Sequence, residues 1–589
     1  MSKTNKIFSA VPVKIPDRSG FDLSHEVLTT AKTGTVVPIT HFEVLPGDTI
    51  SMGSMMKVTL PPFAVPFMGR VDAELTAAFI PYRLIWQGWQ SFITQNAGVQ
   101  NSGPAVVSGA VPYDSSKMVP VSVPTINMLS TLYARSAHTQ TNQSALTKEQ
   151  VGAKYFGAGS LADYLGYKRP SSTFNGSTSI SDGSGSISAL PFLAYHKFCD
   201  DWIRDENNMK PYFPKTVFPV SNSRVQPRLL PFMNSIAGNE NSNADYRTAV
   251  IDPMMLYDEA IVYGNAANFV AKYGDQCDVS ICLGDLRQRC WSKDYFTTAT
   301  TRPQAGAEST LMFETFTSLG DGATGEGSGG FTIAQLRAAN SLQKWLERNN
   351  IAGTEYGSQI LAHFGVTPPD AVLNRSVLLG SVRTPVVVSS VENNTGTGTE
   401  SSGSPVGTKS PFGNTLGAAA GFGSGFDKGN LVDNFSPKEH GIIMVFFTLI
   451  PHAYYNSGLK KSLHHKMVGD FAWPEFANIG DQPIRLQELT VNSTSVTPFG
   501  YNQRYSEYKF ELDRISGLLA DGNNLAPYAL QRGFGSAPEL GKAFLEIPTN
   551  YLDQVLGVSA DVAGFGCMVD AYFDCRALRV LPEYSLPSL

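Results

Sequence analysis

Alternation of apolar and polar residues with a period of two is the clearest local pattern in this chain. Over Arg70–Ile80, every second position from Val71 to Phe79 is apolar, and the positions between them include Asp72, Glu74 and Thr76. A period of two is typical of a strand with one buried face, so we expect a half-buried strand here.

Two further β-type runs precede this one. Thr35–Val44 and Thr49–Leu60 are rich in β-branched and other apolar residues. Leu45–Asp48 lies between them and predicts a turn, because Pro46 fixes its own φ and Gly47 tolerates positive φ. A β-sheet therefore begins near the start of the chain, without the alternation of strands and helices that builds parallel sheets.

Strand patterns return in the last third of the chain, at His440–Tyr455, Ile484–Val491 and Val562–Leu581. Ile442–Ile450 within the first of these is apolar on both faces, which predicts a strand covered on two sides. It is too short for a membrane-spanning helix, which needs about 20 residues.

Helical spacing of apolar residues appears at Leu84–Thr94, Ser160–Gly166, Pro191–Asn207 and Thr332–Asn349. The last has a capping box at its start and is expected to bury a stripe that includes Trp345. Strands at both ends of the chain, with helices and loops between them, favour a mainly β antiparallel sandwich in which distant segments pair.

Three long stretches interrupt this pattern: 95–190 and 208–293 are predicted to be mostly loop, and 392–430 is rich in Gly, Ser and Thr. Such a composition predicts either a flexible linker between two cores or a long surface excursion from one. A linker would place a domain boundary here, whereas an excursion would belong to a single β domain.

Composition adds a constraint on the surface. Hydrophobic residues make up 42%, aromatic residues 11% and charged residues only 16% of the 589 positions. A surface poor in charge fits one that faces other subunits, and it fits an uncharged loop surface equally well. The net charge of −6 argues against a protein whose whole body coats nucleic acid, though a local basic patch is compatible with it.

Six cysteines in so long a chain predict no disulfide framework. Cys567 and Cys575 share one strand face, but eight residues of strand separate them by far more than a disulfide spans. We expect reduced thiols and assembly in a cytoplasm. The N-terminal residues show no apolar signal-peptide region, and we expect no membrane association.

Candidate enzyme chemistry is weak. Gly325–Gly330 matches the GxGxxG pattern after a possible strand at Phe313–Leu319, but Glu326 would place a negative charge in a phosphate cradle. No second parallel strand ending in Asp or Glu follows. A Gly-rich surface loop is the better interpretation.

Metal and acid–base sites are no better supported. His196 and Cys199 lie one helical turn apart with Cys277 and Cys282 downstream, but the spacing does not match a zinc motif, and buried free thiols are expected. Asp200–Asp201 is expected to be a pair of solvated charges on a helix. We predict no cofactor.

The densest basic run is Gly458–Lys466. It contains Lys460, Lys461, His464, His465 and Lys466, with Tyr454, Tyr455 and Trp473 nearby. Basic groups interleaved with aromatic rings can hold single-stranded nucleic acid by phosphate contacts and base stacking. A solvated loop is the simpler alternative, because short charge runs are common.

Several motifs, in order along nearly the whole chain, resemble one family. They are FDLSHEVLTT (21–30), EVLPGDT (43–49), FIPYRLIWQGWQSF (79–92), LPFLAYHKFCDDWIRDEN (190–207), DYFTTATTRPQAG (294–306), IAQLRAANSLQKWLER (333–348), HFGVTPPDAVLNR (363–375), EHGIIM (439–444), PFGYNQRYSEYKF (498–510) and RVLPEYSLPSL (579–589). The chain is similar to the major capsid protein of microviruses, the small icosahedral single-stranded-DNA bacteriophages, and within them to the gokushoviruses.

The resemblance implies an eight-stranded antiparallel jelly roll with long insertions and no enzymatic activity. It implies a virion protein, of which about 60 copies close into a T=1-type shell around a circular single-stranded DNA genome. It further implies partners: a scaffold, a small basic DNA-binding protein and a host surface receptor. The basic run would then face inward and contact the genome. Under this resemblance we expect 1–589 to be a single domain with 95–190, 208–293 and 392–430 as insertions, and we expect 392–430 to become ordered only in the assembled shell.

One departure from the family concerns its protruding spike. The region Gly306–Phe331, where the family carries a large insertion, is short here, and 208–293 is longer than expected and is a candidate for an alternative protrusion. Two other function classes fit the β-rich pattern: a β-sandwich adhesin or receptor-binding virion protein, and a β-rich hydrolase with carboxylates scattered along the sequence.

Overall fold

The computed structural model describes most of the strand-forming sequence. The described residues are 18–61, 66–85, 157–167, 187–212, 284–303, 356–370, 374–392, 419–477, 480–493, 498–520, 522–556 and 566–583, with isolated positions between them. The GxGxxG segment, the possible strand before it, Gly306–Phe331, Cys277 and Cys282 lie outside these residues, as does most of 95–190 and 208–293.

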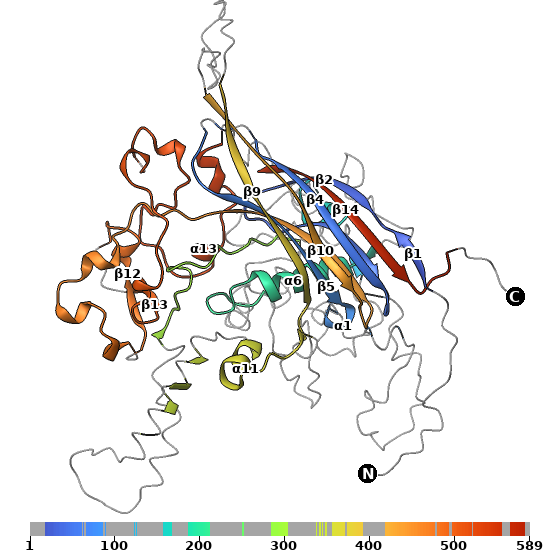
Figure 1. Ribbon diagram of the computed structural model, residues 1–589, viewed down its shortest axis with the longest axis horizontal. Helices are drawn as coiled ribbons and strands as arrows, with labels where there is room; N and C mark the ends of the chain where they lie inside the picture. The colour runs from blue at the N-terminus through green and yellow to red at the C-terminus, as the bar shows by residue number, and fades with distance from the viewer. Residues whose placement is uncertain are drawn as a thin grey trace, which may run out of the picture.

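One curled antiparallel sheet forms the body of the protein (Figure 1). Its path of eight strands runs β1-β14-β4-β10-β9-β5-β11-β3, and β2 also pairs with β14, beyond β1 along the same edge. The predicted mainly β jelly-roll class is confirmed. The strands are β1 (Ser19–Asp22), β2 (His25–Ala31), β3 (Val37–Val44), β4 (Thr49–Thr59), β5 (Val71–Pro81), β9 (Val377–Glu392), β10 (Ala419–Phe435), β11 (Gly441–Pro451) and β14 (Cys567–Arg579).

The principal hydrophobic core lies inside the curl of this sheet. β14 alternates buried and exposed residues along its length, and β4 does the same from Ile50 to Val58. Their buried side chains join those of β3, β5 and β11 in one cluster. The first and last strands of the chain are thus direct neighbours, as the strand patterns at both ends predicted. The turn at Leu45–Asp48 is also confirmed, with Gly47 at φ 86°.

The prediction that Arg70–Ile80 is half-buried is wrong. Every residue of β5 and every residue of β11 is buried. Part of the second face of both strands, around Ala78 and Ile80 of β5 and Met444 and Phe446 of β11, packs against α6 (Leu190–Phe198), which continues as a π-helix over Cys199–Ile203. The ring of Phe198 stacks on Phe446 of β11 with centroids 3.8 Å apart. A helix more than 100 residues later in the chain therefore buries Ala78 and Ile80, and other distant segments bury the polar positions of β5.

The polar residues of β5 are buried with partners on neighbouring segments. Glu74 meets Arg289 and Arg383, each at 2.9 Å. Asp72, fully buried, meets Arg70 at 3.0 Å and His452 at 3.2 Å. Buried carboxylates persist only when they are paired in this way, so the polar half of β5 is a set of ion pairs.

The interpretation of 392–430 as a linker or loop is also wrong for its second half. Residues 419–430 belong to β10, which lies between β4 and β9 in the single chain, while 393–418 lie outside the described residues. Glycine serves close packing here. A Cβ on Gly429 would lie 2.5 Å from Val382 Cγ2, and one on Gly423 would lie 2.8 Å from Leu60 Cδ1. A glycine-rich composition therefore marks tight curvature of the sheet at these positions.

A second body of short elements lies beside the sheet, labelled by β12 and β13 in Figure 1. We call residues 452–550 the 3-10 lobe, because it contains many 3-10 turns. The predicted strand Ile484–Val491 is only partly correct: β12 (Gln482–Arg485) pairs with β13 (Pro498–Asn502), and a 3-10 turn over Leu486–Glu488 follows β12. The lobe has its own apolar core, which includes Ile484 and Phe499.

The remaining described elements are short. They are α1 (Tyr82–Ile85), α5 (Leu161–Tyr164), α11 (Tyr356–Phe364), α13 (Lys542–Leu545) and a small sheet of β6 (Thr125–Ile126), β7 (Ile187–Ser188) and β8 (Val250–Ile251). α1 and α5 confirm the beginning of the helix predicted at Leu84–Thr94 and the one at Ser160–Gly166. Described positions within Thr332–Asn349 are helical, but Trp345 is 48% exposed, against expectation. None of the described helices is long and apolar enough to cross a membrane.

Candidate nucleic-acid and assembly surface

The basic run lies on the outside of the 3-10 lobe. Lys461–His464 forms a 3-10 helix with no buried residue, and two more 3-10 turns follow at Val468–Asp470 and Pro474–Phe476. Gly458 at its start is pressed against Glu488, since a Cβ there would lie 1.8 Å from the carbonyl oxygen of Glu488. This close contact sets the position of the first residue of the basic run against the backbone of Glu488.

The three lysines of the run have different surroundings. The ammonium of Lys460 bonds both carboxylate oxygens of Glu511, at 2.6 and 2.8 Å, in a solvent-exposed pair. Lys461 donates to the carbonyl of Pro483 at 3.2 Å, and burial lowers its pKa although Glu488 and Glu507 act in the opposite direction. Lys466 is exposed, and within the described part of the chain its ammonium has no acceptor. Lys460 and Lys466 are therefore the accessible cations.

The two histidines differ as well. Burial, followed by the charges of Arg485, Lys466 and Lys461, lowers the pKa of His464, so this ring is neutral at pH 7. The ring of His465 lies between Phe471 and Tyr508, with centroids 5.3 and 6.3 Å away. Its Nε2 is 3.8 Å from Glu507 Oε1. His465 is thus packed into the surface.

Two arginines from other parts of the lobe join the run and were missed by sequence reasoning. Arg485 ends β12 and Arg504 follows β13, and the charges of both lower the pKa of Lys461. Arg504 also lies over the ring of Tyr505, 5.2 Å from its centroid. The signal was not visible in the sequence, because only the pairing of β12 with β13 brings these residues beside Lys461.

The aromatic partners are also different from those predicted. Tyr455 is buried in the lobe core, and the hydroxyl of Tyr454 accepts a hydrogen bond from the backbone N–H of Arg70 at 3.1 Å. Both are structural. Trp473 is 44% exposed, and further exposed apolar side chains surround the run. These are Leu463, Met467, Val468, Phe471, Phe476, Tyr508 and Phe510.

A buried arginine ties the lobe to the sheet body. Arg532 donates to the hydroxyl of Tyr455 at 2.9 Å and to the carbonyl of Phe544. Its guanidinium also lies 4.7 Å from the centre of the Trp291 ring. The Tyr455 hydroxyl in turn donates to Asp294 at 2.6 Å. A guanidinium surrounded by rings and acceptors fixes the orientation of the whole lobe.

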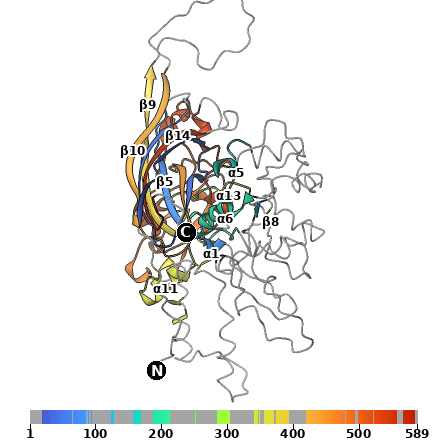
Figure 2. The same ribbon diagram turned by 90° about the vertical axis from the view of Figure 1, so that its right-hand side faces the viewer.

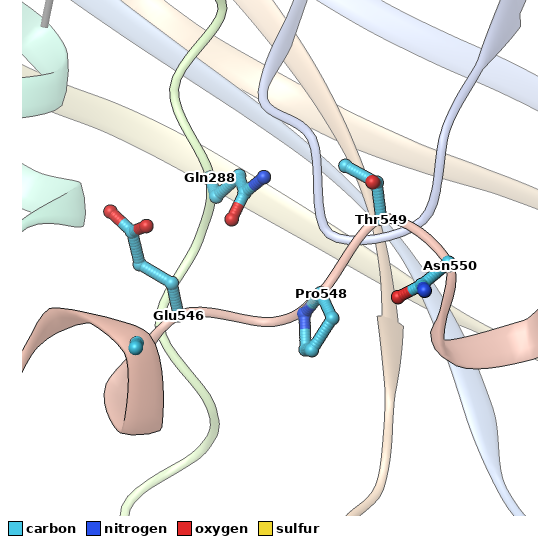
Figure 3. A pocket seen from close by; sticks show the side chains of 6 residues that line it. Gln288, Glu546, Pro548, Thr549 and Asn550 are labelled. Atoms are coloured by element: carbon cyan, nitrogen blue, oxygen red, sulfur yellow. The ribbon is translucent and has the colours of Figure 1, made fainter. Parts of the chain in front are cut away.

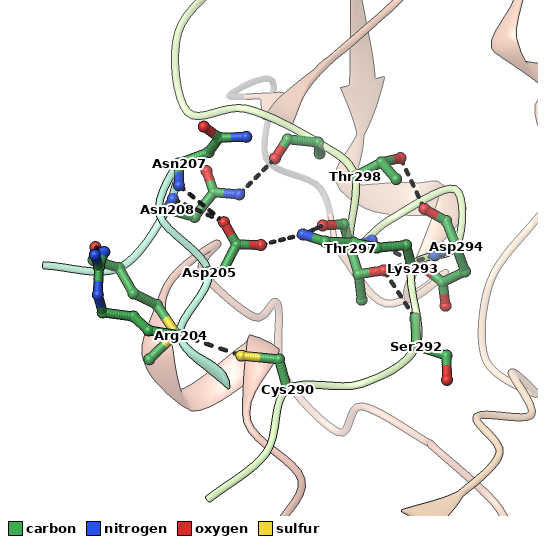
Figure 4. Close-up of polar contacts among 12 residues, drawn as sticks. Arg204, Asp205, Asn207, Asn208, Cys290, Ser292, Lys293, Asp294, Thr297 and Thr298 are labelled. Carbon is green, nitrogen blue, oxygen red and sulfur yellow. Dashed lines mark hydrogen bonds and ion pairs between the residues drawn. The ribbon is translucent and has the colours of Figure 1, made fainter. Parts of the chain in front are cut away.

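Segments 204–209 and 290–298 brace the base of the lobe (Figure 4). Asp205 accepts the backbone N–H groups of Asn207 and Asn208 and pairs with the ammonium of Lys293. Asp294 in the second segment accepts the N–H of Thr297 at 2.8 Å. These contacts close both turns, so the position of Asp294 beneath Tyr455 is set by local hydrogen bonds.

The other candidate sites are structural. His196 accepts a hydrogen bond from Arg287 at 3.2 Å, and Cys199 is a buried free thiol whose pKa burial raises to about 12. The expectation that Asp200–Asp201 is solvated is wrong: Asp200 pairs with Arg204, and Asp201 pairs with Lys197. No group of three potential metal ligands occurs among the residues that the structure describes.

An open hollow at the edge of α13 is shown in Figure 3. Gln288, Ala543, Glu546, Pro548, Thr549 and Asn550 line it. Glu546 is the single ionisable residue among these six.

The sequence of the chain is similar to those of known proteins. The family described as "Capsid protein (F protein)" matches residues 9–126 and 156–589. The chain belongs to this phage capsid protein family. The match spans the sheet, α6 and the 3-10 lobe.

Individual capsid proteins are similar over almost their full lengths. Capsid protein VP1 of Chlamydia phage 1 is 25% identical, covering 99% of this chain and 97% of that protein. Capsid protein VP1 of Bdellovibrio phage phiMH2K is 26% identical, with the same coverage of both chains. Capsid protein VP1 of Spiroplasma virus 4 is 23% identical over 97% of this chain and 95% of that protein.

Proposed function

We propose that this capsid protein assembles with itself into a small T=1-type icosahedral shell of about 60 copies around a circular single-stranded DNA genome. In this proposal 1–589 is one domain whose insertions tile neighbouring copies. The shell forms in the host cytoplasm and becomes the virion.

The exposed apolar surface of the 3-10 lobe carries the assembly proposal. Leu463, Met467 and Val468 are 68%, 74% and 73% exposed within a stretch of six residues, and Phe471 follows. Soluble monomers rarely expose such contiguous apolar groups, whereas interface cores are rich in aromatic residues and methionine. Sedimentation velocity of the purified chain tests this: large closed particles are expected, and a stable monomer at all concentrations would contradict it.

We infer that the cationic side of the same lobe contacts the packaged DNA. Lys460 and Lys466 are accessible, and Arg485 and Arg504 add charge beside them. The pair between Lys460 and Glu511 is exposed, and such pairs contribute about 0–1 kcal/mol, so a phosphate can replace the carboxylate. Lys461, His464 and His465 complete the proposed contact region but act mainly by holding its shape.

We further infer that the chain has no catalytic activity or cofactor of its own, which is supported by the names of its relatives, all of them capsid proteins. Its net charge of −6 leaves most of the genome's charge unneutralised and supports a separate small basic DNA-binding partner. A scaffold and a host surface receptor complete the proposed set of partners.

A further inference from the structure

The β9–β10 hairpin extends beyond the rest of the sheet. β9 pairs with β5 only as far as Val386, and β10 pairs with β4 only from Ser424 onward. Beyond these points, among the described strands, Ser389–Glu392 and Ala419–Phe422 pair with each other alone. Figures 1 and 2 both show this two-stranded end, which we call the β9–β10 arm, projecting past the other strands.

An arm of this kind has two open edges. The outward backbone N–H and C=O groups of each strand have no ladder partner among the described residues, and a two-stranded ribbon alone is marginally stable in water. Val387, at the base of the arm, is 62% exposed. The arm therefore gains most from a partner that covers its edges.

The sequence of the arm lacks the usual protection of exposed edges. Its eight paired residues contain no proline and no lysine, and Glu392 is the single ionisable residue among them. Natural edge strands are commonly protected by lysine, proline or a bulge. Depletion of charge is instead typical of residues that become the centre of an interface.

We propose that the β9–β10 arm binds a neighbouring copy of this chain and that this contact closes the shell. The inference rests on the proposed function and names one of its contact surfaces. A second copy is the partner we favour over a host receptor for a physical reason. Open, uncharged strand edges repeated on every copy would pair one particle with another if they pointed into solvent.

Two variants of the full chain test this. The first replaces 389–422 with Asn-Gly, which joins the paired residues Val388 and Gly423 through a two-residue turn and leaves the sheet register intact. The second, Ser389→Lys with Ser390→Lys, keeps the chain length and puts lysines on the arm. A control lacks only 395–416 and keeps every paired residue.

Sedimentation and electron microscopy of each protein, beside wild type, give the outcomes. Both arm variants are expected to keep the wild-type circular dichroism spectrum and to form shells at least about tenfold less efficiently, while the control assembles. Shells at wild-type yield from the lysine variant, or from a folded deletion variant, would overturn the inference. Loss of assembly in the control would do so too, because the contact would then lie in 395–416. A wild-type chain that forms no shells would instead contradict the proposed function.

Discussion

Glu74 on β5 and Arg383 on β9 face each other across one antiparallel rung, with Glu74 Oε2 and Arg383 Nη2 2.9 Å apart. Arg289 contacts the same oxygen of Glu74 from a segment more than 200 residues after Glu74 in the sequence. The carboxylate therefore joins two strands of the sheet to the segment that braces the 3-10 lobe. This relationship makes the outer face of β5 a junction between the two bodies.

Replacing Glu74 by Gln should destabilise the unassembled chain by roughly 1–3 kcal/mol at pH 7, because Arg289 and the partly exposed Arg383 lose their shared counter-charge. Urea unfolding measures this. Glu26→Gln, at an exposed position of β2, is the matched control and should change stability by less than about 0.5 kcal/mol. Equal effects of the two substitutions would contradict the role of Glu74.

The same pair predicts a pH dependence. Burial acts to raise the pKa of Glu74, but Arg289, Arg383 and Ser381 outweigh it, so the pKa is lowered from 4.5. A lowered pKa contributes stability that is complete above the unfolded value and is lost as pH falls through the folded value. The difference between wild type and Glu74→Gln should therefore be constant above about pH 5 and shrink below 4.5. A difference that grows on acidification would contradict the assignment.

The stack of Phe198 on Phe446 should stabilise the attachment of α6. Phe198→Ala removes a fully buried ring and should cost about 3–5 kcal/mol in urea unfolding. Phe364→Ala, whose ring is 78% exposed on α11, is the control and should leave the unassembled chain nearly unchanged. A small effect of Phe198→Ala would mean that α6 does not depend on this contact.

How far the sequence predicted this fold differs from strand to strand. β14 and the turn before β4 were predictable, because one buried face produces strict alternation and a turn needs Gly47. The second buried face of β5 was not, because α6 and the segments that carry Arg289 and His452 cover it from distant parts of the chain. β10 was not predictable for another reason. Its glycines are required by close neighbours such as Val382, and no local sequence pattern shows which residues those neighbours are.

The candidate surface was predictable only as a run of charges. Lys460 and Lys466 are accessible as expected, but the desolvation of Lys461 and the burial of Tyr455 depend on tertiary packing. Arg485 and Arg504 reach the site through a strand pair that local composition does not specify. The sequence shows the run of charges, and the fold decides which of its groups face solvent.

The accessible lysines should matter for the genome. Lys460→Gln with Lys466→Gln should lower the DNA content per particle and weaken the dependence of binding on salt, because two phosphate contacts are lost. Lys57→Gln with Lys428→Gln, which removes two exposed lysines on β4 and β10, is the charge-matched control. Absorbance ratios of purified particles measure the content. Unchanged DNA content in the double variant would reject the contact.

The described thiols should resist modification. Burial raises the pKa of Cys567 to about 12 and that of Cys575 to about 11, so neither forms the reactive thiolate at pH 8. Peptide mapping after brief alkylation should show both unlabelled in the native chain and labelled in urea. Labelling of either residue at the denatured rate in the folded chain would contradict their burial.

The exposed apolar lobe should be required for assembly. Met467→Asp with Val468→Asp places charge on side chains that are exposed in the single chain, so the melting temperature should stay within a few degrees of wild type. Particle formation, followed by light scattering, should be lost, because association of the copies would bury the two introduced aspartate charges without partners. Normal assembly of this variant would show that the lobe faces solvent.

Electron microscopy of the purified wild-type chain tests the central claim most directly, since it asks whether identical copies close into a shell. The account predicts uniform, closed, roughly spherical particles, each of about 60 copies by mass. Discrete monomers or trimers of the purified chain under all conditions would contradict it.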